Sequence, residues 1–469
     1  MRSVERAQAQ ARTADTRTIL MLTAAATFGL LGSRPILEPS ASGLRRHHSS
    51  GTMVPPPDSK GWFDGESVGA CAVLFDPVLK EWTMFYAGRP TNFAGGDVVP
   101  IATGLIGLAK STDGLNWEKV HAEGGPMGSC FAPLESDDSS FDAVHVAVGD
   151  VVQEDSSLRM WYFGGGQDAK SLGVGKEFRG VRMSIGQCIS TDGGLSWSRG
   201  ADGRNDATLI PTDGTQMFLG WPTVVHGRDG LPTLGSSAHL FYHACDLTDA
   251  GKFAIARATL RRPAELADFS AEPEDEYVLR AGSAGEFDAG GVSARSVIAH
   301  PRDPRLCLMV YEAQSEARRH TIGLAHSDDA GATWTRVGGG SVFEPSEEPD
   351  AWDGGAVARP YVVLLPEDDE QEEPAGGRGG GRQSLTWPRA RMYYLGRSLD
   401  GKRQGIGAAE SVNGDWTEWR RVQPQARAPA ASASPRATRR PQKPKAKRAV
   451  SDLFRPDRLG GGTTEGTKW

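Results

Sequence analysis

A short stretch recurs four times in this chain and limits what the chain can fold into. Each copy has an aromatic residue, an aspartate and, nine residues after the aspartate, a valine within a β-branched run. The four aspartates are Asp64, Asp142, Asp288 and Asp353. A fixed distance between an acidic residue and the strand that follows it is typical of a structural repeat.

Two further patterns follow in a constant order, and they occur five times. The first is Met or Leu, one residue, then tyrosine, at Tyr86, Tyr162, Tyr242, Tyr311 and Tyr394. The second is Ile or Phe followed by a small residue, and it leads into a polar turn and a tryptophan. Short apolar runs separated by Gly, Asp, Asn and Ser predict strands, four in each unit. The third unit lacks the aromatic–aspartate pair, and we place its start near Phe218.

These units predict an all-β fold, a five-bladed β-propeller of four-stranded antiparallel sheets. We expect one propeller domain over residues 61–422. Its blades are expected near residues 61–120, 141–200, 216–270, 286–337 and 351–422.

The first 60 residues have the features of a targeting segment. An apolar run from Ile19 to Gly32 follows an arginine-bearing start and is too short to cross a bilayer comfortably, so we expect no stable membrane span. The apolar run suggests secretion, whereas the Arg, Ser, Ala and Thr content also suits an organellar transit peptide. The sequence has no Asn-X-Ser/Thr acceptor and an odd number of cysteines, which favours an organelle, a plastid; secretion is the alternative. The five cysteines form no metal-ligand spacing, and we expect buried thiols, no metal and no cofactor.

Two segments are expected to be disordered tails or inserts. Residues 423–469 are rich in Pro, Ala, Ser, Arg and Lys, and Glu367–Arg382 joins an acidic run to a Gly-Arg run. Because both ends of the chain are basic while the whole chain has a net charge of −7, the propeller itself is strongly acidic. Such a surface repels phosphate backbones, so nucleic acid is excluded as a partner of the folded domain.

The outer turns contain a pattern that looks catalytic but predicts structure. Ser190–Trp197 and Ser327–Trp334 fit Ser-x-Asp-x-Gly-x-x-Trp, while Ser111–Trp117 and Ser411–Trp416 are shortened copies. These turns resemble Asp boxes. The aspartate is expected to accept backbone N–H bonds across the hairpin, and the tryptophan is expected to pack between neighbouring sheets.

Residues that differ between the copies are better candidates for function. Two blades place an ionisable residue directly after the repeated tyrosine, namely His243 and Glu312. Since the first strand of each blade lines the central channel of a propeller, polar residues there gather at the channel mouth. This reasoning adds substrate-binding candidates: Trp221, Arg295, Arg359, His145, Asp150, Asp288 and Asp353. For Asp288 and Asp353, a loop-capping role is an equal alternative.

The five blades, the aspartates that open the first two of them and the run from Gly107 to Trp117 resemble the five-bladed propeller glycosidases. This is the arabinanase, levansucrase and invertase superfamily, which includes glycoside hydrolase family 43. The resemblance covers residues 61–422. It implies that Asp64 is a general base or nucleophile and that Asp142 orients the substrate. It also implies a glutamate general acid at the start of the third blade, where this sequence has Leu219-Gly220-Trp221-Pro222.

The leading hypothesis is therefore a glycoside hydrolase-like enzyme that acts on a small or oligomeric carbohydrate through paired carboxylates, with Glu312 or Asp213 as a displaced acid. A catalytically inactive carbohydrate-binding propeller is the second hypothesis, and the missing glutamate favours it. A sialidase-like enzyme and a protein-interaction propeller are weaker alternatives.

Overall fold

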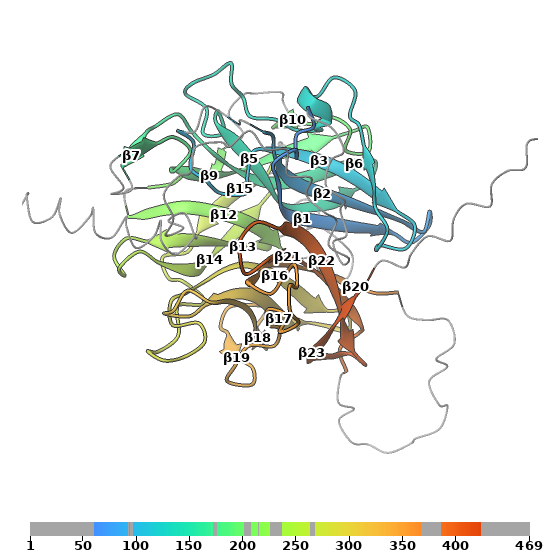
Figure 1. Ribbon diagram of the computed structural model, residues 1–469, viewed down its shortest axis with the longest axis vertical. Helices are drawn as coiled ribbons and strands as arrows, with labels where there is room; N and C mark the ends of the chain where they lie inside the picture. Colours follow the sequence, from blue (N-terminus) through green and yellow to red (C-terminus); the bar gives the residue numbers. More distant parts are fainter. Residues whose placement is uncertain are drawn as a thin grey trace, which may run out of the picture. The chain divides into compact units, whose positions relative to one another are not determined.

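The structure is a computed structural model that describes residues 61–91, 93, 97–171, 176–200, 208–213, 215–225, 237–262, 268–366 and 386–423. Within these ranges the chain forms five antiparallel sheets, arranged in sequence order as the blades of a propeller (Figure 1). The predicted targeting segment, the insert Glu367–Arg382 and the tail beyond residue 423 lie outside the described residues. The predictions made for them, including the compartment, stay predictions.

Each blade is built from consecutive strands. Blade one contains β1 (Ser67–Asp76), β2 (Glu81–Arg89), β3 (Leu105–Ser111) and β4 (Glu118–Val120), and it is followed by the 3₁₀ turn η2 (Pro126–Gly128). Blade two contains β5 (His145–Glu154), β6 (Ser157–Gly165), β9 (Met183–Ser190), β10 (Ser198–Arg199) and β11 (Thr208–Ile210); β7 (Lys170–Ser171) and β8 (Glu177–Phe178) form a separate ribbon. Blade three contains β12 (Gln216–Val224), β13 (Ser237–Asp246), β14 (Lys252–Arg261) and β15 (Ser270–Pro273). Blade four contains β16 (Gly291–His300), β17 (Asp303–Gln314), β18 (His320–Ser327) and β19 (Thr335–Arg336). Blade five contains β20 (Ala356–Leu364), β21 (Ala390–Arg397), β22 (Gln404–Val412) and β23 (Asp415–Val422).

The five-bladed prediction is confirmed, with one difference in blade two. Its sheet has five strands, because β11 pairs with β9 beside the two-residue β10. Such a short β10 leaves backbone groups of β9 unpaired, and the returning chain pairs with them at Gly186 and Ile185.

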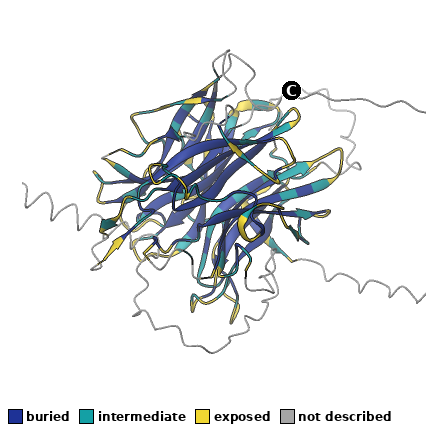
Figure 2. Cartoon of the chain, turned by 90° about the horizontal axis from the view of Figure 1, so that it is seen from above, coloured by how far each residue is buried: buried dark blue, intermediate teal, exposed yellow. Residues whose placement is uncertain are grey.

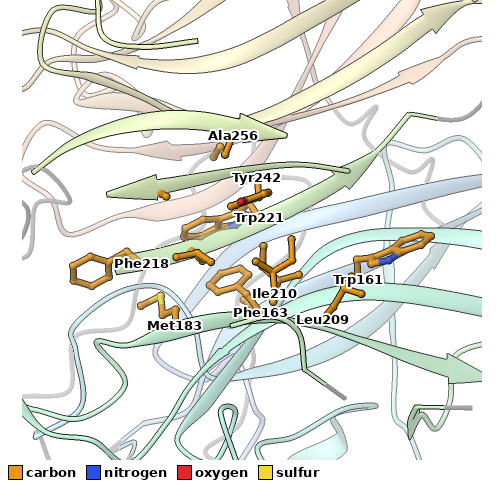
Figure 3. Packing of buried hydrophobic residues seen from close by; sticks show 14 of the residues in the cluster. Trp161, Phe163, Met183, Leu209, Ile210, Phe218, Trp221, Tyr242 and Ala256 are labelled. Carbon is orange, nitrogen blue, oxygen red and sulfur yellow. The ribbon is translucent and has the colours of Figure 1, made fainter. Parts of the chain in front are cut away.

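The core lies between the sheets, so the inner strands are buried on both faces. In β5 the first eight residues are all buried, and Figure 2 shows the same burial along the central strands of the other sheets. Among the described residues, five apolar clusters fill the spaces between successive blades. The largest of them holds Phe163, Phe218, Trp221 and Tyr242 between blades two and three (Figure 3).

The outer turns adopt the Asp-box structure that the sequence predicts. In blade four, Asp329 accepts a hydrogen bond from the backbone N–H of Thr333 at 2.9 Å, and the Trp334 indole packs edge-on against Phe241 of blade three. Trp197 of blade two packs in the same way on Phe85 of blade one. These two turns therefore connect neighbouring blades.

The first strand of every blade is interrupted by a β-bulge at the level of the repeated tyrosine. The pairing shifts occur between Val68 and Cys71, Val148 and Asp150, Gly220 and Thr223, Ser293 and Arg295, and Ala358 and Tyr361. A bulge changes the direction of the side chains that it contains. The channel-lining residues are therefore positioned by these five irregularities.

Two further observations limit the fold. No helix among the described residues is long and apolar enough to cross a membrane.

All five cysteines are buried and unpaired, as the sequence predicts, and burial raises the pKa of the Cys130 thiol to about 12. A thiol held in its protonated form is a poor nucleophile and a poor metal ligand.

Candidate functional site

The four repeated aspartates make the same contacts in their four blades. Each aspartate accepts a hydrogen bond from the tyrosine on the second strand of its own sheet. Each also forms an ion pair with a Lys or Arg that follows the tryptophan of the outer turn. The sets are Asp64–Tyr86–Lys119, Asp142–Tyr162–Arg199, Asp288–Tyr311–Arg336 and Asp353–Tyr394–Arg421. In blade two, the Tyr162 hydroxyl donates at 2.9 Å and Arg199 Nε at 2.8 Å.

These aspartates lie over the outer half of their sheets. The partners of Asp64 come from β2 and β4, whereas the channel is lined by β1. A Cβ atom added at Gly88 of β2 would lie 2.7 Å from the Asp64 Cβ, and one at Gly164 of β6 would lie 2.4 Å from the Asp142 Cβ. Glycine at these two positions therefore allows the aspartate loop to approach the second strand closely.

The side chains of Asp64, Asp142 and Asp288 are 0 % exposed, and that of Asp353 is 2 % exposed. A catalytic base has to come within hydrogen-bond distance of its substrate, which a fully covered carboxylate cannot do without a rearrangement. The geometry favours the loop-capping role for all four. The catalytic roles of Asp64 and Asp142, and the ligand-binding roles of Asp288 and Asp353, stay predictions.

Asp150 instead connects three blades across the channel. Its carboxylate accepts hydrogen bonds from the Tyr361 hydroxyl of blade five at 2.8 Å, from the Thr223 hydroxyl of blade three at 3.1 Å and from the Val224 backbone N–H at 2.9 Å. Asp150 therefore joins the inner strands to one another in the centre of the propeller.

His145 lies at the start of β5 and is fully buried. Its Nε2 is 2.9 Å from the Gly180 carbonyl oxygen, and burial lowers its pKa to about 4. The loop 97–104 covers this end of blades one and two: Gly104 and Val146 exchange two backbone hydrogen bonds, and Arg89 donates to the carbonyls of Val99 and Ile101. His145 is thus a neutral part of the core and does not contact solvent.

A different group of residues comes together on the first, second and third strands of blades three, four and five. We call it the channel cluster, and it consists of the predicted residues Trp221, His243, Arg295, Glu312 and Arg359 together with His320, which the sequence analysis does not single out. Trp221 and Arg359 have positive φ angles of 45° and 53°. Among the described residues, only these two and Phe218 combine a non-glycine side chain, a positive φ and a position within a strand. Such backbone strain costs roughly 1–3 kcal/mol per residue and is concentrated at binding and active sites.

The two strained residues contact each other. The Arg359 guanidinium lies over the Trp221 ring, 4.4 Å from its centroid, and Phe163 and His243 pack around the same indole at centroid distances of 4.5 and 5.0 Å. Figure 3 shows Trp221 among the apolar residues of blades two and three. Because Trp221 is only 6 % exposed and already contacts a guanidinium, the geometry favours a role in orienting Arg359. Stacking of a sugar on Trp221 stays a prediction.

Glu312 is held as a carboxylate by its neighbours. One oxygen lies 2.7 Å from His320 Nδ1, and the other accepts a hydrogen bond from the Arg359 backbone N–H at 3.1 Å. Burial favours the protonated form, but the hydrogen bond from His320 and the charges of His320 and Arg359 outweigh it, so the pKa of Glu312 is lowered. A general acid needs the opposite shift. Asp213, the other candidate acid, accepts backbone N–H bonds from Thr215 and Gln216, and its pKa is also lowered.

Arg295 completes the cluster from β16. Its Nη2 donates to the Phe241 carbonyl oxygen, and its side chain is almost fully buried. Burial lowers its pKa to about 9, against the attraction of Asp150. The pKa of His243 is lowered well below its ordinary value by burial and by the charges of Arg295 and Arg359. The imidazole is thus neutral and lies close to two guanidinium groups.

The cluster differs from a metal site. Within the part of the chain that the structure describes, no group of three His, Cys, Asp or Glu side chains is arranged to hold a metal ion. Its donors and acceptors are suited to hydrogen-bonding an oxygen-rich ligand.

Comparisons with known proteins agree with this architecture. Neither the family models nor the curated proteins give a match to the sequence. Among solved structures, a glycosyl hydrolase from Bacteroides ovatus aligns with a TM-score of 0.50 and 13 % identity over 81 % of this chain and 96 % of that chain. The similarity is one of fold.

Two further solved structures align with slightly lower scores. A thermostable family-43 glycoside hydrolase aligns with a TM-score of 0.49 and 12 % identity, over 77 % of this chain and 95 % of that chain. A β-1,2-mannobiose phosphorylase from Listeria innocua, solved with β-1,2-mannobiose, aligns with a TM-score of 0.46 and 13 % identity, over 77 % and 94 %. The predicted resemblance to five-bladed propeller glycosidases is therefore confirmed for the fold.

Sequence analysis missed the cations that bind the four aspartates and the partner of Glu312. A signal for the cations is present, because Trp117, Trp197, Trp334 and Trp419 are each followed two positions later by Lys or Arg. His320 has no such signal. It is placed next to Glu312 only by the pairing of β17 with β18.

Proposed function

We propose that this protein is a carbohydrate-binding propeller whose ligand lies at the channel cluster, and that it does not cleave glycosides through Asp64 and Asp142. The observation that carries the proposal is the fourfold Asp–Tyr–cation set, which gives both aspartates the contacts of Asp288 and Asp353 and leaves their side chains 0 % exposed. Repetition in four blades is expected of a structural element and not of a catalytic pair.

The channel cluster supports the ligand site because it occurs once, with different residues from each blade. Arg359, His320 and Ser293 keep partial exposure, so a ligand can approach from the side of blades four and five. Arginine, histidine and glutamate side chains provide donors and acceptors for sugar hydroxyl groups, and Arg359 is already fixed by Trp221.

A direct binding experiment tests this proposal. Saturation-transfer NMR against a panel of neutral and acidic oligosaccharides is expected to show binding to the parent protein. Binding is expected to fall by at least tenfold in Glu312→Gln and to be unchanged in Asp303→Asn, where the substituted carboxylate pairs with Arg305 on an exposed hairpin. No binding by any member of the panel, or equal binding by both variants, would contradict the proposal.

One observation favours a second candidate, hydrolysis at the same cluster. An ionised Glu312 next to His320 has the charge state of a nucleophile or general base. Such an enzyme would turn over aryl glycosides with good leaving groups, which need no general acid, and Glu312→Gln would abolish turnover while Asp64→Asn would not. Turnover lost in Asp64→Asn, with its fold intact, would restore the leading hypothesis drawn from the sequence.

A further inference from the structure

The guanidinium groups of the channel cluster have donors that nothing in their surroundings accepts. Across the described residues, Nε and Nη1 of Arg295 and Nη1 of Arg359 are buried and have no hydrogen-bond acceptor. A guanidinium cannot lose its charge under physiological conditions, so these N–H groups stay donors. Buried donors without acceptors are rare in folded proteins, and each one needs an explanation.

The carboxylates nearest to these arginines are already occupied by other donors. Asp150 accepts hydrogen bonds from Tyr361, Thr223 and Val224, and Glu312 accepts from His320 and from a backbone N–H of residue 359. Neither carboxylate accepts a guanidinium hydrogen bond in these contacts. Asp150 and Glu312 thus attract Arg295 and Arg359 by their charges. The N–H groups of the two guanidinium groups that have no acceptor are left for another acceptor.

His243 is affected by the charges of both arginines. Besides burial, the charges that lower its pKa are those of Arg295 and Arg359. The Ala294 backbone N–H also donates to His243 Nδ1 at 2.9 Å. Both guanidinium groups thus act on the same imidazole, in a chain whose net charge is −7.

The backbone is strained in order to keep this arrangement. Arg359 lies at a β-bulge with a φ of 53°, and the residue that orients it, Trp221, lies at another with a φ of 45°. Strain of this kind persists where a side chain has to be held in a particular direction. Arg359 keeps partial solvent exposure, whereas Arg295 lies deeper, with 3 % exposure. Of the two guanidinium groups, that of Arg359 is therefore the one closer to solvent.

We propose that the channel cluster recognises an acidic sugar, a uronic acid, whose carboxylate accepts hydrogen bonds from the guanidinium groups of Arg359 and Arg295. The inference rests on the proposed function and adds the class of ligand. A carboxylate matches the planar guanidinium fork and supplies acceptors for several N–H groups at once, whereas a neutral sugar offers single hydroxyl groups and no charge.

The test compares ligands that differ only at the carboxylate. Binding of D-galacturonate, its neutral methyl ester and D-galactose to the full-length protein is measured by saturation-transfer NMR and by isothermal titration calorimetry, with inorganic phosphate as a fourth ligand. D-galacturonate is expected to bind at least tenfold more tightly than the ester and D-galactose, and its binding is expected to weaken with added salt.

Variants assign the effect to the cluster. Arg359→Gln is expected to remove the preference for the acid, and Arg359→Lys, which keeps the charge but not the planar fork, is expected to retain only part of it. Arg305→Gln, on an exposed hairpin, is the matched control and is expected to keep the full preference. Circular dichroism and thermal melting verify that each variant is folded. If Arg359→Gln does not fold, Arg359→Lys and the comparison of acid with ester in the parent decide the result.

The possible failures are distinguishable. Equal binding of acid, ester and D-galactose would overturn the uronic-acid inference and leave the carbohydrate-binding proposal standing. Binding of inorganic phosphate but not of D-galacturonate would also overturn it. No binding of any sugar would overturn both.

Discussion

At the residue scale, the aspartate repeat shows how the same chemistry can indicate catalysis or structure. The resemblance to propeller glycosidases predicts that Asp64 and Asp142 act on the substrate, and the sequence places Asp288 and Asp353 in the same position of two further blades. The structure adds a tyrosine and a cation to each of them. Whether such an aspartate has a structural or a catalytic role is therefore indicated by its partners and not by the aspartate itself.

Replacement of two equivalent aspartates separates the roles. Asp64→Asn and Asp288→Asn remove the same charge from the same surroundings, and breaking a buried ion pair costs roughly 3–5 kcal/mol. We expect both variants to lose comparable stability in chemical denaturation and to keep ligand binding once folded. A structural role is contradicted if Asp288→Asn is destabilised while Asp64→Asn keeps the parent stability and loses only activity.

At the scale of strands and turns, the sequence predicts the strands that recur in every blade and misses the features that occur in a single blade. The fixed spacing of the aspartate, tyrosine and tryptophan positions predicts five blades because each element has to bury the same faces. The added strand β11 and the positive φ angles of Trp221 and Arg359 are single departures from the repeat. Both residues precede a proline, at Trp221-Pro222 and Arg359-Pro360. Such departures depend on contacts with other blades, which a single sequence does not display. Trp221, Arg295, Glu312 and Arg359 could be named as candidates, but not their mutual contacts.

The repeat also supplies a test of strain in these elements. Arg359 and Ala330 both have positive φ, and Ala330 occupies the Asp-box position that is Gly193 in blade two, with a φ of 74°. Ala330→Gly is expected to raise the free energy of unfolding by roughly 0.5–1 kcal/mol without changing ligand binding.

Arg359→Gly is expected to relieve similar strain while it removes the contact with Trp221, so its free energy of unfolding should stay within about 1 kcal/mol of the parent. Ligand binding should be lost. Both quantities are measured by urea denaturation and by NMR titration. A loss of more than about 3 kcal/mol would show that Arg359 is held in place for stability and not for a ligand.

At the scale of the whole propeller, the ring is closed by side chains. Every blade consists of consecutive strands, so the described chain start contributes no strand to the last blade. Strands β21 and β22 of blade five lie beside β1 of blade one (Figure 1). The Tyr393 hydroxyl donates to the Gly114 carbonyl oxygen at 2.8 Å, and Arg391 donates to the Asp113 carbonyl oxygen at 2.8 Å. Gln404 adds a bond to the Val68 carbonyl oxygen. This interface holds blade one and blade five together, and its hydrogen bonds connect residues far apart in the sequence.

Two adjacent tyrosines allow this closure to be tested. Tyr393→Phe removes the hydroxyl that bonds to blade one, whereas Tyr394→Phe removes the one that bonds to Asp353 within blade five. Each loss is expected to cost about 1–2 kcal/mol, because a buried hydrogen bond is broken and its acceptor is left behind. The two variants should differ in which strands are destabilised. In native-state hydrogen exchange, Tyr393→Phe should speed exchange in β1 and β22 on both sides of the interface, while Tyr394→Phe should affect blade five alone. If both variants gave the same pattern of exchange, the ring would open as one unit, and the contacts between blades one and five would not be its weakest point.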